Sequence, residues 1–132
     1  MAQDTTGGSG APAPAADPPV LIVDGANVVG SVPDGWWRDR RGAAERLRDR
    51  LAARAEGEEV VLVVEGAARG VESVPGVRVD AAPGSGDDRI VELAAAHADR
   101  DCVVVTADRA LRERVRVYGA RCVGPRAVRP AD

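Results

Sequence analysis

The stretch at residues 20–27 reads VLIVDGAN, a short apolar run that ends directly in an acidic residue and a glycine. Runs that are apolar on both faces and rich in β-branched residues are typical of strands buried on both sides, as in a parallel sheet. Similar runs follow at residues 60–64, 77–79 and 102–105, and a weaker one at 121–123. The first run therefore predicts the first strand of a parallel sheet.

Helical patterns separate these runs. Apolar residues recur at helical spacing in residues 41–55, 87–98 and 109–117. The resulting order is strand, helix, strand, strand, helix, strand, helix, strand. Such alternation predicts an α/β fold whose parallel strands are joined by right-handed crossovers.

The length of 132 residues fits one domain. We expect a disordered Gly/Ala/Pro tail at residues 1–18, a folded domain at 19–126 and a short C-terminal tail at 127–132. The sequence contains no apolar run near the roughly 18 residues of a membrane span and no secretory signal pattern, which predicts a cytoplasmic protein without membrane association. Cys102 and Cys122 lie inside apolar runs and are predicted to be buried thiols in a reducing compartment.

An acidic residue follows most of the predicted strands. In open α/β sheets, ligands bind beyond the carboxyl ends of the strands. The acids at these strand-to-loop transitions are Asp24, Glu65, Asp87, Asp88 and Asp108. Oxygen ligands without Cys or His favour Mg²⁺ or Mn²⁺ over zinc, and one or two such ions can promote attack on phosphorus. The sequence therefore predicts a metal-binding carboxylate cluster.

Several of these residues also have a purely structural interpretation. Asp87 sits where a helix N-cap is equally expected, whereas no long helix starts directly after Asp24. Asn27 either orients Asp24 or a metal-bound water, or simply holds the turn. Thr106 either caps the last helix or positions Asp108 and the scissile phosphate.

The basic residues narrow the chemistry. All 18 are arginine, which excludes mechanisms that need a lysine, such as a Schiff base or a P-loop. The net charge of -3 by itself argues against a nucleic-acid binder. Leaving out the acids of residues 1–18 changes this charge to -1, and setting aside the five acids at strand ends leaves +4. The acidic balance is therefore compatible with RNA binding.

Four motifs lie in chain order at these strand ends. They read DGANVVGS at 24–31, EG at 65–66, GSGDDRI at 84–90 and VTADR at 105–109. This set resembles the NYN domain of the PIN-like nuclease superfamily, and its YacP-like branch most of all. The resemblance covers residues 20–125 and implies a three-layer α/β/α sandwich with a central, mostly parallel sheet and a metal-dependent endoribonuclease.

The resemblance also implies roles for individual residues. The catalytic residues that match the family motifs are Asp24, Asn27, Asp88 and Asp108. The metal ligands implied are Asp24, Glu65, Asp87, Asp88 and Asp108. Two departures weaken the expected substrate contacts: Ala26 stands where the family often has an aromatic residue, and residues 106–108 read Thr-Ala-Asp where Thr-Ser-Asp is common.

Aromatic and arginine side chains near the strand ends are the predicted RNA contacts, because bases stack on indole rings and arginine binds phosphate. These residues are Trp36, Trp37, Arg38, Arg40, Arg69, Arg89, Thr106 and Arg109. Two alternatives remain open. The tryptophans would instead cover a core that has no Phe, and Arg89 and Arg109 would instead pair with neighbouring carboxylates.

RNA is thus the predicted partner, and the sequence leaves open a homodimer or an association with ribosomes or other RNA-processing machinery. The main alternative is a non-catalytic RNA-binding module of the same fold. A phosphohydrolase of the haloacid-dehalogenase type would need a second Asp at position 26, which is Ala, and a lysine. A dinucleotide-dependent oxidoreductase would need G-x-G-x-x-G after the first strand, which is absent.

Overall fold

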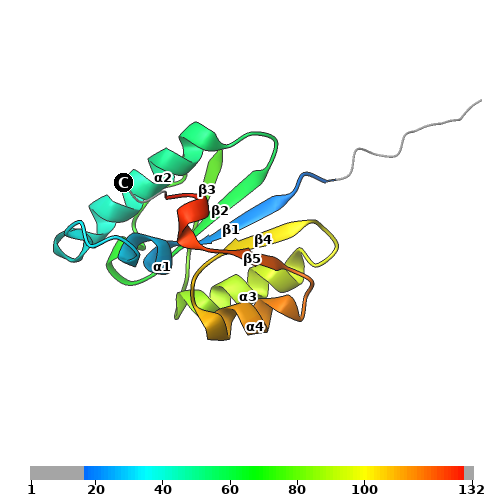
Figure 1. Ribbon diagram of the computed structural model, residues 1–132. Helices are drawn as coiled ribbons and strands as arrows, with labels where there is room; N and C mark the ends of the chain where they lie inside the picture. The colour runs from blue at the N-terminus through cyan, green and yellow to red at the C-terminus, as the bar shows by residue number, and fades with distance from the viewer. Residues whose placement is uncertain (1–16, 130–132) are drawn as a thin grey trace, which may run out of the picture.

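A parallel sheet of five strands forms the centre of the computed structural model, which describes residues 17–129 (Figure 1). The strands are β1 (Val20–Asp24), β2 (Glu59–Val64), β3 (Val77–Ala81), β4 (Cys102–Val105) and β5 (Arg121–Val123). They are arranged in the order β3-β2-β1-β4-β5, and every neighbouring pair is parallel. Each of the five apolar runs is confirmed as a strand.

Helices cover both faces of this sheet. They are α1 (Gly25–Gly30), α2 (Arg40–Arg54), α3 (Gly86–Ala96) and α4 (Arg109–Arg116), with short 3-10 turns η1 (Trp36–Arg38), η2 (Gly66–Ala68) and η3 (Pro125–Ala127). Figure 1 shows α1 and α2 on one face and α3 and α4 on the other. The expected three-layer α/β/α sandwich is confirmed, with a fully parallel sheet.

The short helix α1 was not expected. It begins directly after Asp24, whose carboxylate accepts a hydrogen bond of 3.3 Å from the backbone N–H of Asn27 and so caps the helix. A six-residue helix is too short to show an apolar periodicity of its own. Asp24 is therefore both the last residue of β1 and the N-cap of α1.

Two apolar clusters fill the space between the sheet and its helices. Successive side chains of a strand point to opposite faces, so Leu21 packs with Leu51 of α2, whereas Ile22 packs with Ile90 of α3 and Leu111 of α4. The strands therefore read as continuous apolar runs because both of their faces are covered. No helix within residues 17–129 is long and apolar enough to cross a membrane.

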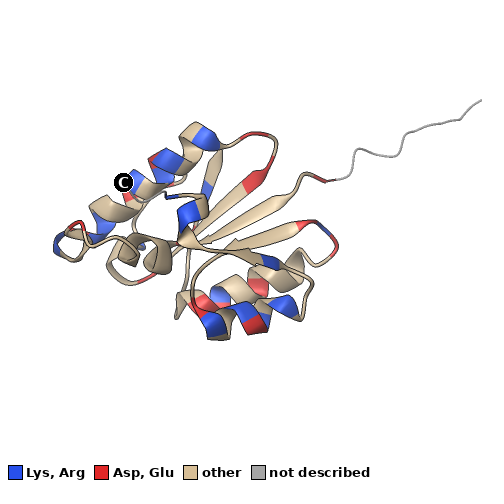
Figure 2. Ribbon diagram, viewed as in Figure 1, with Lys and Arg blue, Asp and Glu red and all other residues tan. Residues whose placement is uncertain are grey.

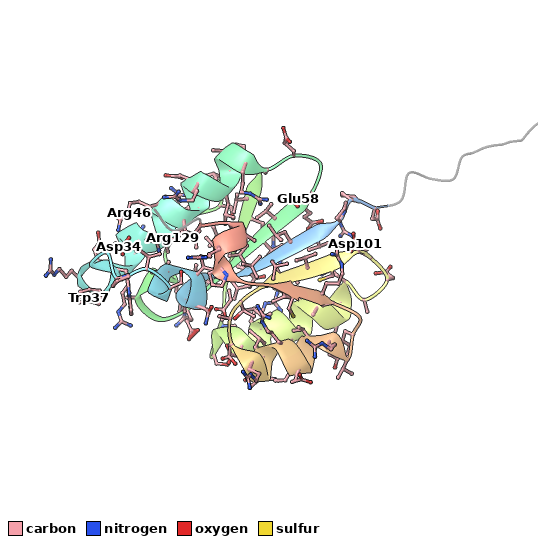
Figure 3. The ribbon with its side chains drawn as sticks, in the orientation of Figure 1. Asp34, Trp37, Arg46, Glu58, Asp101 and Arg129 are labelled. Carbon is pink, nitrogen blue, oxygen red and sulfur yellow. The ribbon has the colours of Figure 1, made fainter. Side chains whose placement is uncertain are left out.

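The folded domain reaches farther toward the C-terminus than expected. Val128 is 2% exposed and belongs to the apolar cluster that α1 and α2 form with the sheet. Arg129 donates hydrogen bonds to carbonyl oxygens of α1 and pairs with Asp34, which lies beside it in Figure 3. The boundary expected before a tail at 127–132 is therefore too early, because its first residues are packed. The predicted disorder of residues 1–16 lies outside the described residues.

The two cysteines lie on neighbouring strands and are both free thiols. Cys102 is buried, as expected, whereas Cys122 on the edge strand β5 is only half-buried. Burial raises the pKa of both thiols above the usual value. Neither thiol is therefore prepared for nucleophilic chemistry.

The strand order creates a switch point at the carboxyl ends of β1 and β4. From β1 the chain moves to β2 on one side, and from β3 it crosses to β4 on the other side. Connections that leave in opposite directions open a crevice between these two strand ends, and this is where ligands of open α/β sheets bind. Asp24 ends β1, and Thr106 follows β4.

Candidate functional site

A buried hydrogen bond joins the two strands at the switch point. The hydroxyl of Thr106, which is fully buried, donates to Oδ2 of Asp24 at 2.9 Å. The Asp24 carboxylate is 5% exposed, so it depends on this donor and on its helix-capping bond for its polar contacts. The bond fixes the direction in which the Asp24 carboxylate faces the sheet edge.

A hydrogen bond joins the loop after β4 to helix α1. Oδ1 of Asn27 accepts a hydrogen bond of 2.8 Å from the backbone N–H of Ala107. Thr106 accepts a bond of 3.1 Å from the backbone N–H of Asp108 through the same hydroxyl that contacts Asp24. Asp108 in turn caps α4 by accepting from the N–H of Leu111. Asn27 thus joins α1 to the loop after β4.

Glu65 joins the site from the end of β2. Its Oε1 accepts a hydrogen bond of 3.2 Å from the backbone N–H of Gly86 at the start of α3. A Cβ on Gly86 would lie 2.6 Å from this oxygen, so the Glu65 side chain would have to move away from a larger residue at this position. Gly25, at the start of α1, lies in a similarly tight position, because a Cβ there would lie 2.5 Å from the carbonyl oxygen of Val63. Both glycines let neighbouring elements meet at the sheet edge.

Only one of the two acids at the start of α3 faces this edge. Burial raises the pKa of Asp87, and the charges of Asp108 and Glu65 raise it further, which places Asp87 close to them. Asp88 is 69% exposed at its side chain and pairs with Arg114 of α4 at 3.0 Å. Asp88, assigned by motif to catalysis and to the metal, is thus paired with an arginine, whereas Asp87, assigned to the metal, is the acid whose pKa is raised by the charges of Asp108 and Glu65. We call Asp24, Glu65, Asp87 and Asp108 the carboxylate cluster.

The pKa of the Asp24 carboxyl is raised by the same two effects, burial and nearby negative charge. Burial raises the pKa of its carboxyl, and the nearby charges of Asp87 and Glu65 act in the same direction. Hydrogen bonds from Thr106 and from the Asn27 backbone oppose this rise because they stabilise the charged form. Two carboxyl groups of the cluster are therefore held in surroundings that penalise their negative charge. A cation would relieve that penalty.

The donor set determines which cation would fit. No three His, Cys, Asp or Glu side chains of residues 17–129 already stand in an arrangement that could hold a metal ion. Mg²⁺ does not require such a cage, because proteins commonly bind it through one or two carboxylates, with water and substrate phosphates completing the shell. An all-oxygen cluster with repelling carboxylates suits a partly hydrated ion of this kind better than zinc.

Comparison with solved structures supports the fold of this site. The crystal structure of Rae1 (YacP) from Bacillus subtilis, a W164L mutant, is 24% identical in sequence and matches with a TM-score of 0.63. The match covers 81% of this chain and 69% of that chain. The fold is therefore YacP-like, in agreement with the resemblance of the motifs. No protein-family model matches the chain, and no curated protein is significantly similar to it, so the NYN assignment stays a prediction.

The guanidinium of Arg89 is bound by acidic residues outside the carboxylate cluster. Its Nε and Nη2 donate to the two carboxylate oxygens of Asp80 at 2.8 and 2.9 Å, and its Nη1 donates to Glu92 at 3.0 Å. This is the charge-balancing alternative considered from the sequence, and it removes Arg89 from the expected RNA contacts. Its partner Asp80 is buried on β3, and the hydrogen bonds from Arg89 lower the pKa of that carboxyl.

The other expected RNA contacts differ in how exposed they are. Arg69, in the turn after β2, and Arg109, at the start of α4, are both exposed. Trp37 is 50% exposed on the loop between α1 and α2, where Figure 3 labels it at the outer edge, and the guanidinium of Arg38 lies 5.9 Å from its ring centre. Trp36 is half-buried against the core, as the structural alternative expected.

Three contributors to the site were missed from the sequence. Ser85 caps α3 by accepting from the backbone N–H of Asp88, and the pattern of serine followed by an acid three residues later could have indicated this. The Gly86 N–H that binds Glu65 and the pairing of Arg114 with Asp88 left no local signal. Both depend on how α3 packs against its neighbours.

Proposed function

We propose that this chain is a metal-dependent endoribonuclease that hydrolyses RNA phosphodiester bonds at the carboxylate cluster. The observation that carries the proposal is the buried hydrogen bond between Thr106 and Asp24 at the switch point, with three further carboxylates around it. The motifs resemble those of PIN-like nucleases, and the YacP-like fold agrees with that resemblance. Cleavage of phosphodiesters by oxygen-bound metal needs no lysine, serine or histidine nucleophile.

Some residues of the site would bind the ion, and others hold these ligands in position. A bound Mg²⁺ or Mn²⁺ would supply Lewis-acid activation of the phosphate and of water. Asp24 and Asp87 are the ligands we assign first, because nearby acids raise the pKa of both, and Glu65 and Asp108 would complete the set. Thr106 keeps the Asp24 carboxylate in one orientation, so that little reorganisation is needed when substrate arrives.

RNA would approach across the arginine-rich surface beside the cluster. Figure 2 shows basic residues along α2, and mixed acidic and basic residues on α3 and α4. Trp37 with Arg38 offers a stacking surface next to a charge, and Arg69 and Arg109 offer phosphate contacts. Single-stranded segments fit this arrangement, because their bases are free to stack.

The test is cleavage of an end-labelled single-stranded RNA with Mg²⁺ or Mn²⁺, with and without chelator. We expect cleavage that chelator stops and that Asp24→Asn and Asp87→Asn each lower at least about 100-fold. Asp99→Asn is the matched control, because Asp99 is an exposed acid just before β4, at the opposite sheet edge. Cleavage that persists in chelator or in both site variants would refute the proposal.

A non-catalytic RNA-binding module is the second candidate, favoured by one observation. The acids of residues 17–129 do not already form a three-ligand metal group, whereas Trp37 and Arg38 are exposed for binding. This candidate predicts salt-sensitive RNA retention, weakened by Trp37→Ala and Arg38→Ala, with no cleavage product even in excess Mn²⁺. The same labelled RNA distinguishes the two candidates.

A further inference from the structure

A pocket of about 250 Å³ lies beside the carboxylate cluster, at the carboxyl ends of β1 and β2. Its floor is formed by small residues that follow these strands, among them Gly25, Ala26 and Ala67. One wall is Trp36, and Glu65 borders both the pocket and the cluster. Glu65 therefore connects the pocket to the site where cleavage is proposed.

The chemistry of the pocket suits a flat aromatic ring with a phosphate attached. Trp36 is half-buried against the core, which holds its indole in place as a stacking surface. The guanidinium of Arg40, which also lines the pocket, lies 5.3 Å from the centre of the Trp36 ring. An aromatic wall next to an arginine is the combination with which proteins bind unpaired nucleotides.

The size of the pocket limits its occupant. A volume of about 250 Å³ is below the range of about 300–1,000 Å³ typical of pockets for drug-sized ligands. The pocket accommodates one ring system rather than two stacked bases. Because Glu65 belongs to both sites, a base in the pocket would bring its own backbone phosphate toward the cluster.

We infer that this pocket is a subsite for one unpaired nucleobase of the RNA, adjacent to the phosphate that is cleaved. The inference rests on the proposed function and deepens it, because it makes an unpaired base beside the cleavage point a requirement for a good substrate. Trp36 stacks on the base, Arg40 contacts the backbone, and the small floor residues leave room for the ring. Base-paired RNA cannot present a base in this way without flipping it out.

The test measures binding without cleavage. Trp37→Phe and Asp87→Asn are combined, so that Trp36 is the remaining tryptophan and any turnover is too slow to interfere with the binding measurement. A single-stranded RNA of about six nucleotides is compared with a base-free ribose-phosphate chain of equal length. We expect the RNA to quench Trp36 fluorescence and to bind about tenfold more tightly than the base-free chain.

The decisive variant fills the pocket with a larger side chain. Ala67 is exposed and lines the pocket, so Ala67→Leu should block it without disturbing the core, and we expect RNA binding to fall to the base-free level. Ala53→Leu, an equally exposed position on α2 outside the pocket, is the matched control. If Ala67→Leu does not fold, Ala26→Leu fills the same pocket from the other side.

The outcomes separate this inference from the proposed function. The subsite would be overturned if Ala67→Leu left RNA binding and Trp36 quenching undiminished. It would also be overturned if the base-free chain bound as tightly as the RNA. If the Ala67→Leu variant cleaves RNA as well as the wild type does, the nuclease function stands and the subsite is refuted. If wild-type protein cleaves nothing but filling the pocket removes RNA binding, the subsite stands and the nuclease proposal fails.

Discussion

Replacing Thr106 by valine tests whether the buried hydrogen bond at the switch point organises the site. Valine keeps the shape of threonine but removes its hydroxyl, which donates to Asp24 at 2.9 Å and accepts from the Asp108 N–H at 3.1 Å. A hydrogen bond to a charged group contributes about 1.5–3 kcal/mol, and the second lost bond adds about 1 kcal/mol. Because Thr106 is fully buried, water cannot replace either bond, and we expect a loss of about 2–4 kcal/mol in the free energy of unfolding.

The loss should depend on pH in a defined direction. The Thr106 hydroxyl stabilises the charged form of Asp24, so removing it raises further a carboxyl pKa that burial already raises. A raised pKa in the folded state makes stability fall as the carboxyl ionises. Relative to the wild type, Thr106→Val should lose stability as pH rises above the raised Asp24 pKa of the wild type, and the loss should level off above the still higher pKa of the variant.

Urea unfolding followed by circular dichroism across this pH range measures the effect. Thr106→Ser is the control, because it keeps the hydroxyl and loses only a methyl group, at a cost of about 1 kcal/mol. A double-mutant cycle with Asp24→Asn should show a coupling of about 1 kcal/mol or more between the two side chains. The reasoning is refuted if Thr106→Val costs no more than Thr106→Ser, or costs the same in both Asp24 backgrounds.

Three further predictions follow from the same geometry. Asp87→Asn should lower RNA cleavage far more than Asp88→Asn, because Asp88 is exposed and paired with an arginine; equal losses in the cleavage assay would contradict this placement. Gly25→Ala should destabilise the fold by about 1–3 kcal/mol in urea unfolding, because its Cβ would lie 2.5 Å from a carbonyl oxygen of β2; an unchanged midpoint would argue against that close approach. The hydrogen bonds from Arg89 lower the pKa of Asp80, so the stability they provide is present above about pH 3.9 and is lost as pH falls through the lowered value. Asp80→Asn should therefore flatten the acid limb of the stability curve, and a curve parallel to that of the wild type would count against the pairing.

Most of the secondary structure could be predicted because strands and helices each have a characteristic local spacing of apolar residues. Strands buried on both faces require unbroken apolar runs, and each run at residues 20–23, 60–64 and 102–105 lies within an observed strand. The helix that starts at Gly25 was missed because six residues show too little periodicity. The C-terminal boundary was placed too early because nothing local to Val128 indicates that it is buried in the core.

The candidate site could be predicted only in part. Asp24, Glu65 and Asp108 follow strands directly, and the carboxyl ends of parallel strands meet at one edge. The choice between Asp87 and Asp88 was not readable, because adjacent helical residues point about 100° apart and the rotation of α3 decides which one faces the cluster. The partner of Arg89 was likewise undetermined, since Asp80 and Glu92 are brought within reach of it only when β3 and α3 pack together.

By itself, the sequence determined that several carboxylates would stand at one edge of a parallel sheet, because each follows an apolar run that must be buried on both faces. It also restricted the positive charge to arginine. The tertiary structure alone decided that β1 lies beside β4, which creates the switch point and the bond between Asp24 and Thr106. It also placed Trp36 against a pocket next to the cluster. These features depend on contacts between residues far apart in the chain, and such contacts leave no pattern in either stretch alone.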